Sequence, residues 1–172
     1  MDCKQFKIKF LTTMIGIRLM FPKVIQDLDL EPMMVKAMDT EEGFGWTLEI
    51  TKTIAEEYRK YLTLCLEHPN EAVVPSSMVD DFWHLHILDT QKYQEDCQAV
   101  FGYFLHHFPY FGMRGEEDAK NLQKAWSTSC KLYEQRFGKA DEHFWQNSAR
   151  CPKCGRRSED DVSYENRPRL VA

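Results

Sequence analysis

The chain lacks several features that mark common classes of protein. It has no excess of basic residues: 22 Lys and Arg stand against 27 Asp and Glu, giving a net charge of −5 over 172 residues. Because phosphate binding needs a basic face, nucleic acid is not expected as a partner. The apolar stretch 10–17 is too short to span a bilayer, and Arg18 follows it with no small-residue cleavage site. We therefore predict a protein without a membrane span, located in the cytoplasm with reduced thiols.

The sequence also lacks internal repeats, low-complexity tracts and, apart from residues 72–74, the alternating pattern of a β-strand. With 43% hydrophobic and 13% aromatic residues, it can still bury a sizeable core. Three- and four-residue apolar spacings dominate, which is typical of amphipathic helices. They predict an all-α fold, a single helical domain of about five to seven helices with a small cysteine-containing tail at the C-terminus.

Helix boundaries follow from capping and helix-breaking residues. Gly102 and Gly138 are expected to end two of the helices, and Asp80 and Asp81 suit the first turn of another because negative charge favours a helix N-terminus. The predicted helices cover residues 33–39, 46–67, 78–88, 91–101 and 116–137. We divide the chain into an amphipathic segment (1–21), a helical domain with a histidine motif (22–147) and a partly disordered tail with a Cys-x-x-Cys motif (148–172).

Four of the six histidines lie in two tight clusters with a cysteine between them. His84 and His86 belong to the first cluster, His106 and His107 to the second, and Cys97 lies between the clusters. Imidazole is the commonest metal ligand in proteins and the commonest acid–base group near neutral pH. These five residues are therefore the candidate ligands of a first metal site, whose ion would be zinc or, alternatively, copper or iron.

Helical geometry limits how the first cluster can act. His84 and His86 are two residues apart and point to different faces of a regular helix, so they cannot both bind one ion there. Asp80 and His84 are four apart and share a face, whereas His86 lies with the apolar residues. A metal-bound histidine usually donates its second N–H to a carboxylate or a similar group. Asp80, Asp81, Asp89 and Tyr93 are the candidates for such supporting contacts.

A second motif, Cys151-Pro-Lys-Cys154-Gly155, has the form of a zinc knuckle, in which two thiolates face one tetrahedral ion. One knuckle supplies only half a site. The remaining ligands would be His143, eight residues upstream, with Cys130 or Cys3, or the same knuckle of a second subunit. An unligated, redox-sensitive tail remains an alternative interpretation.

The motif around the histidines resembles a known family. The residues that carry the resemblance are Trp83-His-Leu-His-Ile-Leu-Asp-Thr90, the preceding Val79-Asp80, and the later His106-His107 and Pro109-Tyr-Phe-Gly112. They are similar to the glycine-rich domain-containing protein-like family, over roughly residues 24–138. The chain has only eight glycines, so the glycine-rich region is absent. The resemblance implies no established activity, and nothing about RNA binding is carried over.

Two functions follow as hypotheses. The first is a metal-binding helical domain with a histidine-cluster site, whose status as an enzyme the sequence leaves open. The second is a protein-interaction or scaffold module in which the histidines are buried hydrogen-bond partners and the Cys-x-x-Cys tail holds a structural zinc, docks a partner or forms a homodimer. A metal-free hydrolase with Cys97 as nucleophile is the weaker third, because Cys97 is expected in the middle of a helix.

Overall fold

The computed structural model describes residues 21–145, which form seven helices and, within that range, no strand. This confirms the predicted all-α class and the single helical domain. The predicted N-terminal segment, apart from its last residue, and the whole Cys-x-x-Cys tail lie outside the described residues. The helices are α2 (Lys23–Gln26), α3 (Glu31–Met38), α4 (Leu48–Glu67), α5 (Ser77–Leu88), α6 (Thr90–Phe101), α7 (Glu116–Phe137) and α8 (Glu142–Trp145).

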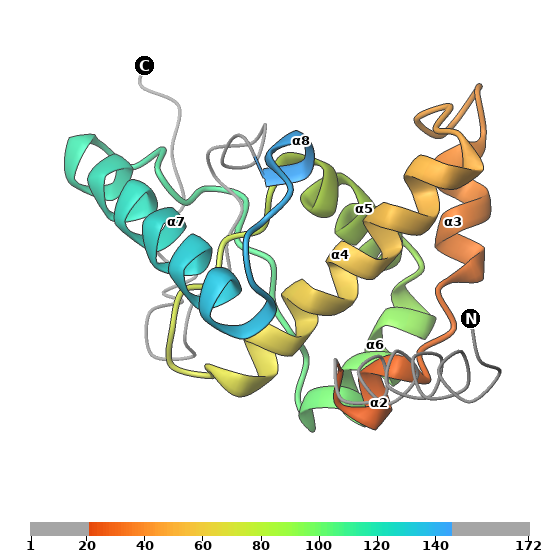
Figure 1. The fold of residues 1–172 in the computed structure, drawn as a ribbon, viewed down its shortest axis with the longest axis horizontal. Coiled ribbons are helices and arrows are strands. Elements are labelled where there is room, and N and C mark those ends of the chain that lie inside the picture. Colours follow the sequence, from red (N-terminus) through yellow and green to blue (C-terminus); the bar gives the residue numbers. More distant parts are fainter. Residues whose placement is uncertain (1–20, 146–172) are drawn as a thin grey trace, which may run out of the picture.

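Helix α4 runs through the middle of the molecule and contacts α2, α3, α5 and α7 (Figure 1). Its predicted apolar stripe is buried: Ile54, Tyr58 and Tyr61 have no exposed surface. The helix begins two residues later than the predicted residue 46, because the Thr47 side chain accepts a hydrogen bond from the Ile50 amide at 3.3 Å and so caps it. The core therefore forms around α4.

Helices α5 and α6 are separated by a sharp bend at Asp89. The Asp89 side chain accepts a hydrogen bond from the Lys92 amide and so caps α6. Gly102 ends α6 in the left-handed conformation, with φ of 75°, which glycine adopts without steric cost. The bend lets α6 pack back against α5, and the chain after Gly102 returns toward the start of α5, where Ser76 and Phe108 form isolated β-bridges.

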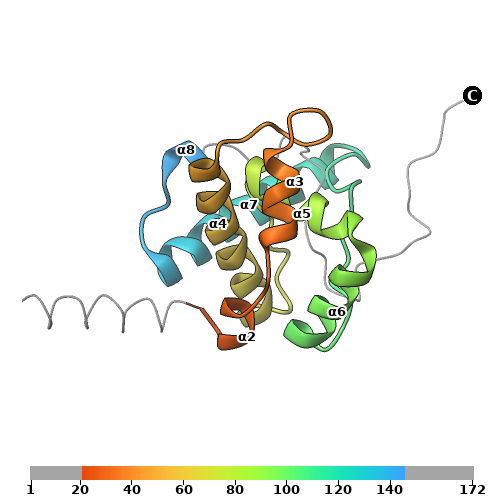
Figure 2. The same cartoon turned by 90° about the vertical axis from the view of Figure 1, so that its right-hand side faces the viewer.

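Helix α2 was not predicted, because four residues are too few to show a helical period. It lies at the same end of the molecule as α6 and contacts it (Figures 1 and 2). Arg59 of α4 donates hydrogen bonds to the carbonyl oxygens of Ile25, at 3.5 Å, and Leu28, at 2.9 Å. These bonds satisfy carbonyls at the end of α2 and fasten this segment to the central helix.

A buried carboxylate joins the C-terminal helices to α4. Glu57, 5% exposed, accepts hydrogen bonds from the Tyr133 hydroxyl of α7, at 2.9 Å, and from Trp145 Nε1 of α8, at 2.8 Å. Its other carboxylate oxygen pairs with Lys60 at 2.7 Å, and Lys60 also donates to the Tyr133 hydroxyl. One carboxylate thus connects three helices.

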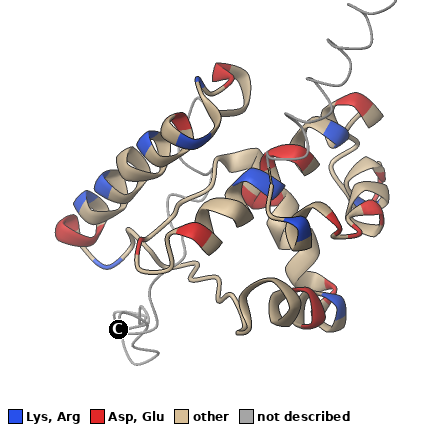
Figure 3. Cartoon of the chain, turned by 60° about the horizontal axis from the view of Figure 1, so that its bottom comes forward, with Lys and Arg blue, Asp and Glu red and all other residues tan. Residues whose placement is uncertain are grey.

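Charges of both signs are distributed over the described helices (Figure 3). Helix α7 begins with Glu116, Glu117 and Asp118 and carries Arg136 in its last turn, which suits the helix dipole at both ends. None of the helices in residues 21–145 is both long enough and apolar enough to cross a membrane.

Candidate metal centre

Three potential metal ligands converge at the first half of α5. Asp80 and His84 come from successive turns of α5, and His107 comes from the segment that follows α6. His84 Nε2 lies 2.9 Å from His107 Nε2 and 3.7 Å from Asp80 Oδ2, while His107 Nε2 lies 3.5 Å from Asp80 Oδ1. All the ligand atoms lie within 4.8 Å of one another, so this group can hold a metal ion.

The three side chains of this group differ in their exposure to solvent. The Asp80 side chain is 2% exposed, that of His107 is 11% exposed and that of His84 is 40% exposed. Asp80 Oδ1 has no hydrogen-bond partner among the described residues. A buried carboxylate oxygen without a partner costs free energy, which a cation or a hydrogen-bond donor would recover.

A relay of hydrogen bonds from Trp83 through Tyr93 to Leu105 attaches the segment that contains His107 to α5. Trp83 Nε1 donates to the Tyr93 hydroxyl at 2.9 Å, and that hydroxyl donates to the Leu105 carbonyl oxygen at 2.5 Å. The edge of His107 then meets the Trp83 ring, with 4.8 Å between ring centroids. Helices α5 and α6 therefore fix the backbone two residues before His107 and pack against its ring.

Beyond His107, Asp118 holds the next loop in place. Its carboxylate accepts hydrogen bonds from the amides of Gly112 and Arg114 and from the Arg114 guanidinium. Burial opposes ionisation of this carboxyl, but the bonds from Arg114 and Gly112 outweigh that effect and hold its pKa below the usual range. The segment that carries His107 is thus anchored on both sides.

Replacing Tyr93 by Phe is expected to destabilise the protein by at least about 2 kcal/mol, because Trp83 Nε1 and the Leu105 carbonyl would both lose a buried partner. Urea unfolding followed by circular dichroism measures the change. Tyr110→Phe, which removes the hydroxyl of a half-buried ring packed on Phe108, is the control and should change stability by less than about 0.5 kcal/mol. Equal effects of the two substitutions would contradict the role given to the relay.

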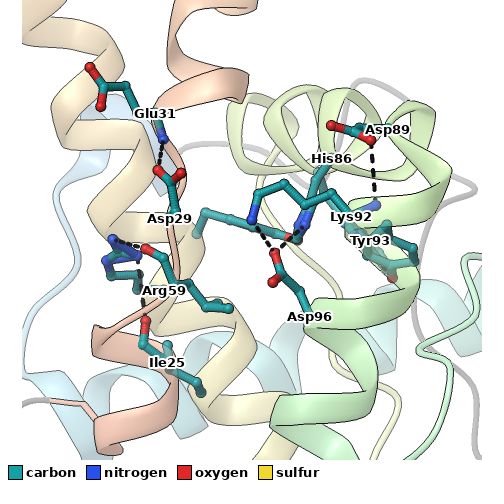
Figure 4. A network of polar contacts seen from close by, with 12 residues as sticks. Ile25, Asp29, Glu31, Arg59, His86, Asp89, Lys92, Tyr93 and Asp96 are labelled. Atoms are coloured by element: carbon teal, nitrogen blue, oxygen red, sulfur yellow. Dashed lines mark hydrogen bonds and ion pairs between the residues drawn. The ribbon is translucent and has the colours of Figure 1, made fainter.

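His86 is buried, 2% exposed, in a separate network on the apolar side of α5, as the sequence predicted (Figure 4). Its Nδ1 meets the Tyr58 hydroxyl at 2.9 Å, and its Nε2 meets Asp96 Oδ2 at 2.9 Å. Lys92 donates to the same Asp96 oxygen at 2.8 Å. Both ring nitrogens of His86 are therefore engaged in joining α4, α5 and α6, and His86 lies outside the Asp80–His84–His107 group.

Cys97 and His106 also lie outside this group. Cys97 is buried in α6, where burial raises the pKa of its thiol, which disfavours a nucleophilic thiolate. His106 is exposed and its ring packs on Phe104. Of the carboxylates expected to support the site, Asp80 lies among the potential ligands, Asp89 caps α6, and Asp81 is half-buried beside Asp80 on α5.

The second predicted site cannot be assembled from the described residues. His143 lies in α8, where its ring contacts Phe144, and Cys151 and Cys154 are outside the described range. A zinc knuckle formed by these residues remains a prediction.

The sequence did not single out Tyr58 or Tyr61 as anything but core residues, although both lie beside the histidines in the fold. Tyr58 bonds to His86, and the Tyr61 ring lies against Trp83 with 5.1 Å between centroids. Their place in the apolar stripe of α4 gave no sign of this, because a tyrosine on such a stripe is normally a packing residue.

Comparison with protein families matches residues 22–142 to the UCP032817-like family, a range that holds Asp80, His84 and His107 and stops short of Cys151. No curated protein and no solved structure matches the chain. The family is uncharacterised and its name gives no support to the glycine-rich designation that the motifs suggested. Since the match covers well over half of the chain, the protein belongs to the UCP032817-like family.

Proposed function

We propose that this protein is a metal-binding helical domain whose ion is held by Asp80, His84 and His107. The observation that carries the proposal is the convergence of two imidazole nitrogens and a buried carboxylate from two separate segments, all within 4.8 Å. Buried charges in proteins are normally paired or coordinate metals. Among the described residues, the basic side chains that pair with Asp80 are these two histidines.

The distances support an ion of the size of zinc. In a tetrahedral site with bonds of about 2.0–2.1 Å, neighbouring ligand atoms stand about 3.3–3.4 Å apart. The two imidazole nitrogens lie 2.9 Å apart, and their contacts with Asp80, 3.5 Å to Oδ1 and 3.7 Å to Oδ2, lie slightly above that value. Because the two contacts with Asp80 use different carboxylate oxygens, the side chains would have to shift for one of these oxygens to join both nitrogens around an ion.

Two histidines and one carboxylate leave coordination positions open, which is the arrangement of catalytic rather than structural zinc sites. The open side faces solvent, because His84 is the exposed member of the group. The same ligand set also suits Fe(II). We propose zinc, with iron and copper as the alternatives, and the ligand set allows a metal-dependent reaction without specifying its substrate.

Elemental analysis of purified protein tests the proposal. We expect about one equivalent of metal in the wild type, its loss in His84→Ala, and its retention in Cys151→Ser and in His106→Ala. The last variant is a matched control, because it removes the histidine next to His107. Metal that is lost only with Cys151→Ser would assign the ion to the tail, and a wild type without metal would overturn the proposal.

A protein-interaction module is the second candidate function. The network of His86 with Tyr58 and Asp96 favours it, since this histidine serves to join helices. In that case His84 and His107 would share a hydrogen bond and no metal would be found. Both candidate functions share three predictions. These are a cytoplasmic location, the lack of a nucleic-acid partner and dimerisation through the Cys-x-x-Cys tail.

A further inference from the structure

Three buried oxygen atoms of α4 and the start of α5 lack an oxygen or nitrogen hydrogen-bond partner. Tyr61 Oη of α4, Ser76 Oγ at the start of α5 and Asp80 Oδ1 each have none among the described residues, although the Cys65 thiol lies beside Tyr61 Oη. Tyr61 and Ser76 have no exposed surface, and Asp80 is 2% exposed. Because buried polar atoms are nearly always paired with protein or with internal water, these three atoms require an explanation.

Ser76 and Asp80 lie on the same side of the first turn of α5. Ser76 occupies the N-cap position of this helix, and its carbonyl oxygen accepts a hydrogen bond from the Asp80 amide at 2.9 Å. Residues four apart on a helix are neighbours on its surface. A serine in this position normally bonds to a free amide of the first turn, but the Ser76 side chain makes no such bond. Its hydroxyl is therefore available to the region around Asp80.

Tyr61 approaches the same region from α4. Its ring packs on Trp83, which in turn packs on His107. Burial raises the pKa of the Tyr61 hydroxyl well above its usual range, and Cys65, Tyr93 and Asp80 act on it in the same direction. The Cys65 thiol near it is a weak hydrogen-bond partner.

We propose that Tyr61 Oη, Ser76 Oγ and Asp80 Oδ1 together bind one internal water molecule, which orients the Asp80 carboxylate for the metal ion. Internal waters typically make about three hydrogen bonds to buried polar groups, which is the number of partners offered here. Tyr61 and Ser76 are then positioning residues that act on the ion through Asp80. The inference rests on the proposed metal site.

Zinc affinity tests this arrangement, measured by competition with a chromophoric chelator. We expect Tyr61→Phe and Ser76→Ala each to weaken zinc binding by about 10–100-fold, as is usual for groups that support a ligand. The double variant should bind zinc about as weakly as either single variant, because each of these variants loses the same water. Single variants with wild-type affinity, or effects that multiply in the double variant, would overturn the proposal.

Tyr58→Phe is the matched control. Tyr58 lies three residues before Tyr61 on α4 and is equally buried, but its hydroxyl bonds to His86 rather than facing Asp80. We expect this variant to be less stable yet to keep the zinc affinity of the wild type. A similar loss of affinity in Tyr58→Phe would mean that the Tyr61 effect comes from general loosening of the core, and would overturn the assignment.

A crystal structure of the metal-free protein separates failure of this inference from failure of the metal site. We expect an ordered water within about 3 Å of all three oxygens, and a wild type that holds this water but binds no zinc would keep the water site and overturn its role in positioning a metal ligand. If zinc binds but no water bridges these atoms, the metal site stands and the positioning role of Tyr61 and Ser76 is wrong.

Discussion

Adding zinc at about one hundred times its dissociation constant to metal-stripped protein is expected to stabilise the fold by about 2.7 kcal/mol. The reason is that Asp80 and His84 meet His107 only in the folded chain, so the complete ligand set is absent from the unfolded state. For a chain of this length the gain corresponds to a rise in Tm of roughly 5–10 °C. Differential scanning calorimetry with and without zinc measures it.

Two variants should abolish this rise. Asp80→Asn keeps the shape of the side chain but removes its negative charge, and His107→Ala removes the ligand from the second segment. We expect the zinc-dependent change in Tm to fall below about 2 °C in both, because affinity falls at least 100-fold. His106→Ala should respond to zinc like the wild type. A zinc response that survives in Asp80→Asn and His107→Ala would place the ion elsewhere.

Replacing Glu57 by Ala is expected to destabilise the protein by about 3–5 kcal/mol, the cost of removing one partner of a buried ion pair. The substitution leaves Lys60, whose side chain is 14% exposed, without its carboxylate. It also removes the acceptor of the Tyr133 hydroxyl and of Trp145 Nε1. Chemical denaturation of the two proteins measures the difference.

Glu56→Ala is the control for this change. Glu56 precedes Glu57 on α4, but its side chain is 57% exposed and its pair with Arg59 is long, at 3.6 Å. An exposed ion pair of this kind contributes little, so we expect a change below about 1 kcal/mol. If Glu57→Ala costs no more than Glu56→Ala, the carboxylate does not hold α7 and α8 to the central helix. A loss specific to Glu57→Ala supports that role.

The helices could be predicted because their signals are local. The stripe of α4 and the helix ends at Gly102 and Gly138 depend on residues within a few positions of one another. Helix α2 escaped prediction because its four residues are held by Arg59 of α4, more than thirty positions away. No local pattern encodes such a contact.

The candidate site was only partly accessible from the sequence. The helical period separated His84 from His86 and paired His84 with Asp80, and the fold confirms that placement. It did not show that Asp80 lies among the ligands rather than behind them. The sequence also did not distinguish His106 from His107 as a candidate ligand, because adjacent residues in a segment without regular structure have no fixed faces.

The helical class, the main helix boundaries and the side of α5 on which each histidine lies could be predicted from the sequence, since these follow from spacing along one element. Which residues meet depends on the packing of the helices. His107 reaches Asp80 because α6 turns back at Asp89 and the Trp83–Tyr93–Leu105 relay fixes the returning segment. Contacts between residues more than twenty positions apart depend on how whole helices pack, and packing is a property of the complete core.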